Sequence, residues 1–192
     1  MPHRPPIHWQ FLTDTLAHYQ SQGYAYIEAP WLVPTAVIDI TAPRLNEVFN
    51  TAEGYLVGSA EQGFLHLMQQ GELPAGRYCA LTPCFREEAP HTNLRRPYFM
   101  KVELIDTTGS DQTAAMVNAA QQWLGSLGNQ PVTQVVTASG IDLEVNQIEV
   151  GSYGFRRHDG LCWTYGTGIA EPRFSQALAQ TSANADTAAT PA

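Results

Sequence analysis

The sequence has few cysteines, and their number is odd. Its 192 residues include three, Cys79, Cys84 and Cys162, without a Cys-x-x-Cys motif. This disfavours a disulfide framework and a zinc site, so we expect reduced structural thiols. No apolar run approaches the roughly 20 residues of a membrane helix. The opening residues, MPHRPPIHW, contain no signal-peptide core. We therefore expect a cytoplasmic protein without a membrane partner.

Positive charge is also scarce. Ten Lys and Arg stand against 18 Asp and Glu, which gives a net charge of −8. This disfavours the broad basic face of a protein that binds long nucleic acids through phosphates. Four of the ten cations nevertheless lie close together: Arg86, Arg95, Arg96 and Lys101. Such a concentration suits a small anionic ligand such as a nucleotide, although a local patch could still contact RNA.

The order of the expected elements indicates an α+β fold. Helices are expected at residues 8–23, 61–71 and 111–128 and from about Gly168. Strands are expected at 24–33, interrupted by Pro30, and at 55–58, 77–88, 96–106, 141–155 and 161–166. We expect one domain over residues 1–179. Residues 180–192, QTSANADTAATPA, are small and polar, which predicts a disordered tail.

The stretch from Thr82 to Asp106 contains two expected strands around a polar loop. Side chains alternate between faces in a strand. In the second strand, Tyr98, Met100, Val102 and Leu104 therefore form an apolar core face. The opposite face carries Phe99, Lys101 and Glu103, and Arg86 and Glu88 share a face in the first strand. Periodicity alone favours a solvated face with cross-strand ion pairs over a binding site.

The segment IDLEVNQIEVGS, residues 141–152, is expected to turn at Asn146-Gln147. A two-residue turn pairs Val145 with Ile148 and Glu144 with Glu149, and Asp142 shares the face of Glu144. Like charges placed opposite each other destabilise a sheet, so a divalent cation such as Mg²⁺ would explain the acids. The alternative is that they point to solvent or pair with Arg156.

The segment YGTGIAEPRF, residues 165–174, places two glycines before an expected helix that carries Arg173. Backbone N–H groups at a helix N-terminus can bind an anion. A simple tight turn is the commoner explanation of Gly-x-Gly.

Taken in order, these segments resemble the three motifs of class II aminoacyl-tRNA synthetase catalytic cores. QGYAYIEAPWL resembles the first, with Pro30 as its proline at a dimer interface. FREEAPHTNLRRPYFMKVE resembles the second, and GTGIAEPR the third. IDLEVNQIEVGSYGFR is similar to a segment of the aspartyl-type subclass. The resemblance spans residues 8–178 and implies an antiparallel sheet flanked by helices.

The resemblance implies an ATP site. Arg86 would hold the α-phosphate and stabilise charge during catalysis. Glu88 would accept a hydrogen bond from the adenine amino group, and Phe99 would stack on the ring. Arg173 would cover the other face of the ring or hold the γ-phosphate, which Arg95 or His91 could also reach. Two acids, Asp142 and Glu149, would hold Mg²⁺ between phosphates.

The resemblance also implies an amino-acid site beside the nucleotide. In GSAEQ, Glu61 would contact the substrate α-amino group, with Ser59 and Gln62 as neighbours. The alternative is an acid favoured by the helix dipole. Four further side chains could line this pocket: Glu103, Ser152, Tyr153 and Arg156.

The sequence departs from an ordinary synthetase in three respects. It has Asn-Gln where the family has Asn-Gly, an acidic net charge, and no recognisable tRNA-binding domain. We therefore expect a stand-alone homodimeric ligase that uses ATP and Mg²⁺ to activate an amino acid. Its acceptor would be a carrier protein, another protein, a small molecule or RNA. The alternatives are a minimal synthetase acting on tRNA and a catalytically silent regulatory or binding subunit.

Overall fold

The computed structural model describes residues 5–41, 48–87 and 90–186, with side chains up to Gln180. It is built on a seven-stranded sheet with the order β1-β5-β6-β10-β9-β8-β7. Only the β1–β5 pair is parallel. The strands are β1 (Ala25–Tyr26), β5 (Arg77–Phe85), β6 (Tyr98–Asp106), β7 (Thr133–Thr137), β8 (Gly140–Val145), β9 (Ile148–His158) and β10 (Leu161–Glu171).

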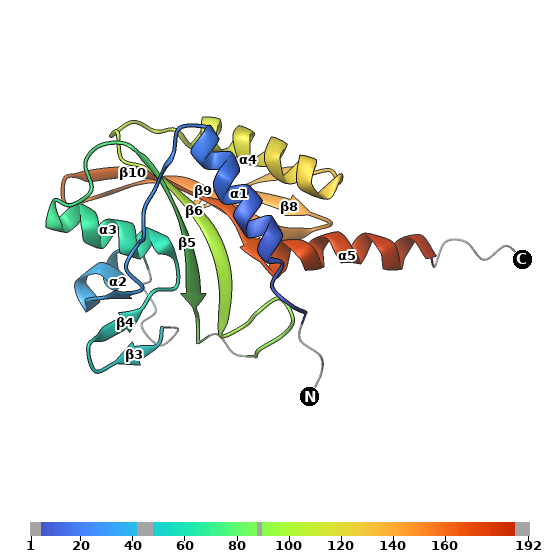
Figure 1. Ribbon diagram of the computed structural model, residues 1–192, viewed down its shortest axis with the longest axis horizontal. Helices are drawn as coiled ribbons and strands as arrows, with labels where there is room; N and C mark the ends of the chain where they lie inside the picture. Colours follow the sequence, from blue (N-terminus) through green and yellow to red (C-terminus); the bar gives the residue numbers. More distant parts are fainter. Residues whose placement is uncertain (1–4, 42–47, 88–89, 187–192) are drawn as a thin grey trace, which may run out of the picture.

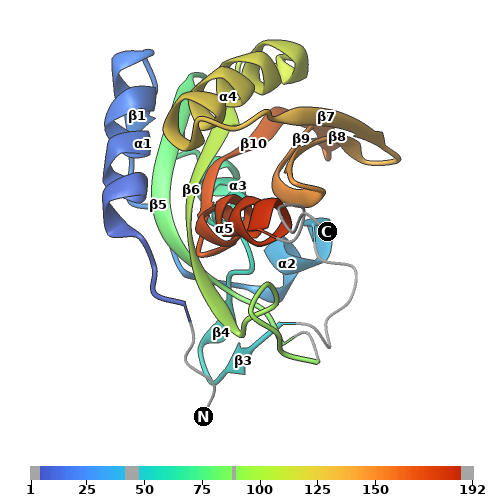
Figure 2. The same ribbon diagram turned by 90° about the vertical axis from the view of Figure 1, so that its right-hand side faces the viewer.

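Helices cover both faces of this sheet (Figures 1 and 2). On one face, α1 (Trp9–Ser21), α4 (Thr113–Gly128) and the first turns of α5 (Arg173–Asp186) enclose the larger core. The other face packs against α2 (Thr35–Thr41), α3 (Ala60–Gln70) and a small sheet with the order β2-β4-β3. Its strands are β2 (Leu32–Val33), β3 (Asn50–Thr51) and β4 (Gly54–Leu56). The antiparallel α+β architecture expected from the sequence is confirmed.

Strand β6 has one core face and one polar face, as its alternation predicts. Val102 and Leu104 are buried in the larger core, and Met100 packs against it. Tyr98 departs from the prediction, because it is 49% exposed at the start of the strand. The opposite face carries Phe99, Lys101 and Glu103, and Cys84 of β5 pairs with Phe99. This face looks away from α1 and α4, toward the side where α3 begins.

The β8–β9 turn lies where the sequence places it. Asn146 and Gln147 have positive φ angles of 51° and 65°, which is the backbone of a tight type I′ hairpin. Val145 pairs with Ile148 and Glu144 with Glu149, as expected. Asn146 also donates from its side chain to the Ala177 carbonyl of α5 at 2.8 Å. The hairpin is thereby attached to the helix that carries Arg173.

The helix expected from Gly168 is wrong. Strand β10 continues to Glu171 and α5 begins at Arg173. The glycines permit close packing within the strand. A Cβ atom on Gly166 would lie 2.4 Å from the Met116 sulfur, and one on Gly168 would lie 2.9 Å from the Tyr19 ring. The β6–β10 register also shifts between Thr167 and Ile169, so Gly168 occupies a bulge.

Helix α5 extends to Asp186, into the segment expected to form a disordered tail. The division into a domain at 1–179 and a tail at 180–192 remains a prediction. None of the described helices has the length and apolar character needed to cross a bilayer.

Candidate active site

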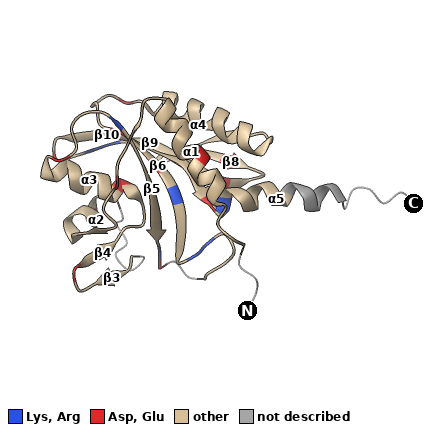
Figure 3. Ribbon diagram, viewed as in Figure 1, with Lys and Arg blue, Asp and Glu red and all other residues tan. Residues whose placement is uncertain are grey.

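A small cleft lies where the β5–β6 loop meets the start of α5. Lys and Arg positions occur along that loop and at the start of α5 (Figure 3). The cleft lining is strongly cationic and includes one aromatic ring. Its residues are Arg86, Asn93, Leu94, Arg95, Arg96, Phe99, Pro172 and Arg173.

Arg86 and Phe99 lie together on the floor of this cleft. The Arg86 guanidinium carbon is 5.2 Å from the centre of the Phe99 ring, within the range of a cation–π contact. Arg86 also donates from Nε to the Gly58 carbonyl at 3.3 Å, and its amide donates to the Pro97 carbonyl at 3.0 Å. The β5–β6 pairing therefore continues past the end of β5 and fixes Arg86 beside the ring.

Arg173 enters the same cleft from α5. It forms an ion pair with Glu149 at 3.4 Å and donates to the Leu94 carbonyl at 3.5 Å. Arg95 also lines the cleft, where its amide and carbonyl bond to Thr92 within the loop. The structure thus brings together Arg86, Arg95, Phe99, Glu149 and Arg173 from three separate segments.

Two further residues, His91 and Glu88, were expected near the nucleotide. His91 is exposed in the loop and is not among the residues that line the cleft. Glu88 lies outside the described residues, so its assignment to adenine stays a prediction.

The charges of Asp142 and Glu149 act on each other, and Glu149 forms an ion pair with Arg173. Burial raises the pKa of Asp142, and the nearby Glu149 charge raises it further, while a hydrogen bond with Ser152 opposes the rise. Two carboxylates that repel each other fit a cation, which would relieve the repulsion. A three-carboxylate cluster with Glu144 is not formed, because no group of three or more potential ligands occurs in the described part of the chain.

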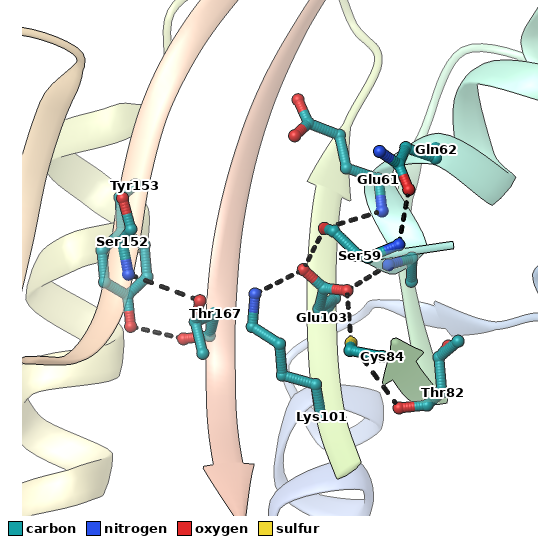
Figure 4. Close-up of polar contacts among 12 residues, drawn as sticks. Ser59, Glu61, Gln62, Thr82, Cys84, Lys101, Glu103, Ser152, Tyr153 and Thr167 are labelled. Carbon is teal, nitrogen blue, oxygen red and sulfur yellow. Dashed lines mark hydrogen bonds and ion pairs between the residues drawn. The ribbon is translucent and has the colours of Figure 1, made fainter. Parts of the chain in front are cut away.

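Glu103 is the centre of a buried polar network on β6 (Figure 4). It is only 4% exposed. Its carboxylate accepts hydrogen bonds from the Ser59 hydroxyl and Lys101 Nζ, each at 2.6 Å, and from the Ala60 amide. Ser59 also caps α3, because its hydroxyl accepts from the Glu61 amide at 3.3 Å. Glu103 therefore attaches the N-terminus of α3 to the sheet, where the helix dipole favours negative charge.

Glu61 lies at the same end of α3 and is also buried. Its carboxylate accepts from Trp163 Nε1 at 2.7 Å and from Arg156 at 3.1 Å. The Arg156 guanidinium stacks 4.3 Å from the centre of the Tyr165 ring. Burial raises the pKa of Glu61, and Arg156 and Trp163 oppose that rise. Glu61 is therefore not solvated, and its place in the first turn of α3 also agrees with the helix dipole.

Three further residues were expected around the substrate: Gln62, Ser152 and Tyr153. Gln62 is buried, accepts from the Gly58 amide at 2.8 Å and donates to Thr41 at 3.1 Å, so it supports the loop before α3. Ser152 lies across β10 from Glu103 (Figure 4). Its amide donates to Thr167 at 3.3 Å and its side chain bonds to Asp142. Tyr153 is buried in the core on the opposite face and donates to the Thr167 carbonyl. It does not line this pocket.

The contact of Trp163 with Glu61 and the ion pair between Lys101 and Glu103 were not predicted from the sequence. Trp163 is fully buried, and its indole N–H holds a carboxylate 102 positions away along the chain. The Lys101–Glu103 pair joins two residues of one strand face. The alternation of β6 could have indicated that pair, whereas no local pattern points to Trp163.

Because the pKa of Glu61 is raised, the difference in stability between the wild type and a Glu61→Gln variant should depend on pH. The ordinary value of this pKa is 4.5, so the folded protein retains the proton longer than the unfolded chain. Its contribution is fully present below about pH 4.5 and is lost as the pH rises through the raised pKa. Glu61→Gln cannot ionise. The free energy of unfolding of the wild type, minus that of the variant, should therefore fall between pH 4 and 7. Urea titrations test this, and a constant difference would contradict it.

Comparison with known proteins supports the sequence resemblance. The chain is 31% identical over 150 residues to the serine–tRNA ligase of Bartonella quintana, which covers 68% of this chain and 34% of the ligase. It is 29% identical over 178 residues to the serine–tRNA ligase of Bartonella bacilliformis, covering 83% and 39%. The chain thus spans less than half the length of these relatives. No model of a known protein family matches it.

Solved structures show the same fold. A pyrrolysyl-tRNA synthetase structure from Desulfitobacterium hafniense superposes with a TM-score of 0.70 at 16% identity, covering 88% of this chain and 68% of that one. A second structure of this enzyme gives a TM-score of 0.67 at 13% identity, covering 91% and 69%. The chain therefore has the fold of a class II aminoacyl-tRNA synthetase catalytic core. Its sequence similarity is to serine–tRNA ligases over part of their length.

Proposed function

We propose that the protein is an adenylate-forming ligase that activates an amino acid with ATP. The observation that carries this proposal is the convergence of Arg86, Phe99 and Arg173 on one cleft. An aromatic ring and guanidinium groups in one cleft suit a nucleotide, because the base can stack while the phosphates are bound by charge.

In the proposed reaction, a carboxylate oxygen of the amino acid attacks the α-phosphorus of ATP. A new P–O bond forms the aminoacyl adenylate, the bond to the bridging oxygen breaks, and pyrophosphate leaves. Negative charge develops on the α-phosphate oxygens. Arg86, held by its bonds to Gly58 and Pro97, would stabilise that charge. Such a transfer depends on positioning and electrostatics more than on a general base.

The acidic pair suits Mg²⁺, which takes oxygen ligands and keeps several waters. Asp142 and Glu149 would hold it, and the metal would supply charge neutralisation of the phosphates. Glu149 would then exchange its present contact with Arg173 for the cation. Arg173 would become available to the nucleotide.

The amino acid would lie beside the nucleotide, next to Glu61. This carboxylate is held by Trp163 and Arg156 and suits a substrate ammonium group. Glu103 and Ser59 would close the same pocket through the network that anchors α3. We assign Gln62 and Ser152 supporting roles through Gly58 and Asp142.

The acceptor that we propose is a carrier protein, another protein or a small molecule. The net charge of −8 supplies little attraction for a long polyanion. Transfer to tRNA is the second candidate, favoured by the similarity to serine–tRNA ligases. We further propose a homodimer through the segment around Pro30, where Tyr26 and Trp31 are 46% and 48% exposed.

The decisive experiment is ATP–pyrophosphate exchange with Mg²⁺ and each of the 20 standard amino acids, followed by common non-standard ones. One or a few amino acids should support exchange well above the rate without amino acid. A parallel titration with ATP measures nucleotide binding. Absence of both exchange and ATP binding would exclude the ligase and favour a silent, synthetase-like binding subunit.

A further inference from the structure

Glu171 is a fully buried carboxylate at the junction of β10 and α5. It lies two residues before Arg173, next to Pro172, which lines the cleft. A buried carboxylate is costly unless hydrogen bonds satisfy it. The hydrogen-bond partners of Glu171 therefore show which elements this side chain connects.

The Glu171 carboxylate binds the first turn of α5. One oxygen, Oε1, accepts from the Ser175 amide at 3.1 Å and from the Ser175 hydroxyl at 2.9 Å. The other oxygen, Oε2, accepts from the same hydroxyl at 2.8 Å. The amide at a helix N-terminus has no partner within the helix. Glu171 supplies that partner, so the direction of the first turn of α5 depends on this side chain.

The same carboxylate also binds the start of α1. The His8 amide donates to Oε2 at 3.2 Å across 163 positions of the chain. The two helix starts also pack directly, because the Phe11 and Phe174 rings meet edge to face at 5.6 Å. Burial raises the pKa of Glu171, and hydrogen bonds from Ser175 and His8 oppose that rise. Glu171 therefore holds α5 against α1.

Helix α5 in turn holds the loop that forms the opposite wall of the cleft. Gln176 donates from Nε2 to the Asn93 carbonyl at 2.8 Å, and Arg173 donates to the Leu94 carbonyl at 3.5 Å. On its other side, Arg96 donates to the Pro5 carbonyl at 2.8 Å, three residues before His8. The loop is therefore attached to α5 on one side and to the segment before α1 on the other. Glu171 joins these same two helices.

We infer that Glu171 is a positioning residue that sets Arg173 and the loop of residues 92–96 in their places around the cleft. Its functional consequence rests on the proposed nucleotide site. The positioning itself is a property of the fold and can be measured without ATP.

The experiment compares Glu171→Ala and Glu171→Gln with the wild-type protein. Hydrogen exchange followed by mass spectrometry reports on residues 91–97 and on the first turns of α5. Alanine removes every acceptor and should speed exchange in both segments, whereas glutamine keeps one acceptor oxygen and should restore most of the protection. Equal exchange in the alanine variant and the wild type would overturn the inference, as would equal loss in both variants.

The second readout is ATP–pyrophosphate exchange. Glu171→Ala should lower kcat/KM for ATP by roughly 10²-fold, the scale of a misplacement of about 1 Å in a catalytic group. Most of this effect should appear as a higher KM for ATP, and Glu171→Gln should recover activity to within a few-fold. A loss of activity shared equally by both variants would contradict positioning through hydrogen-bond acceptance.

Asp106→Ala supplies a matched control. Asp106 is also a buried acid at a strand end, where it accepts from the Thr108 amide and hydroxyl, and it does not line the cleft. Its loss should reduce stability without changing exchange at residues 91–97 or the KM for ATP. If the wild type neither binds ATP nor exchanges pyrophosphate, the proposed function fails, and hydrogen exchange alone still decides whether Glu171 positions the loop.

Discussion

Arg86→Ala is expected to slow ATP–pyrophosphate exchange by roughly 10²–10³-fold, the range for loss of one transition-state donor. The reason is geometric. Arg86 lies 5.2 Å from the Phe99 ring and its Nε is bound to the Gly58 carbonyl at 3.3 Å. Its guanidinium is therefore oriented before substrate arrives and needs little reorganisation during the reaction. Initial rates at saturating amino acid and varied ATP measure the effect.

Two variants make this test specific. Arg86→Lys keeps the charge but not the planar guanidinium, so its rate should lie between alanine and wild type. Arg157→Ala removes an exposed arginine that stacks on Phe155 outside the cleft lining, and it should leave the rate unchanged. A rate for Arg86→Ala within twofold of wild type would remove Arg86 from the mechanism.

Strand alternation predicted the polar face of the site well. A two-residue period separates Lys101 and Glu103 from Val102 and Leu104, and the structure keeps that division. The turn at Asn146-Gln147 was also predictable, because it lies between two apolar-rich segments and Asn tolerates a left-handed backbone. Such features depend on residues that are close together along the chain, so one sequence is enough to predict them.

Features that depend on contacts between distant segments could not be predicted from the sequence. Gly166 and Gly168 look like a turn in isolation, but the side chains that require glycine there are Met116, Tyr153 and Tyr19 from other elements. Whether an acid on this face is solvated or buried also depends on distant segments. Alternation could not distinguish a solvated Glu103 from one held by Ser59 and the start of α3, because α3 is 43 positions away along the chain.

Glu103→Ala is expected to destabilise the protein by about 3–5 kcal/mol, the cost of removing one partner of a buried ion pair. The Lys101 side chain is only 12% exposed and lies 2.6 Å from Glu103. Without the carboxylate its ammonium would remain buried and unpaired. The Ser59 hydroxyl and the Ala60 amide would lose the same acceptor, so α3 should detach from the sheet more easily. Urea unfolding followed by circular dichroism gives the free energy.

A second substitution separates the charge from the hydrogen bonds. If the buried ammonium carries most of the cost, Lys101→Met added to Glu103→Ala should recover part of the lost stability, because methionine fills similar volume without charge. Glu72→Ala, at an exposed acid just after α3, should change stability by no more than about 0.5 kcal/mol. A double variant as unstable as Glu103→Ala alone would show that anchoring of α3, and not charge pairing, is the main role of Glu103. A single variant as stable as Glu72→Ala would contradict both roles.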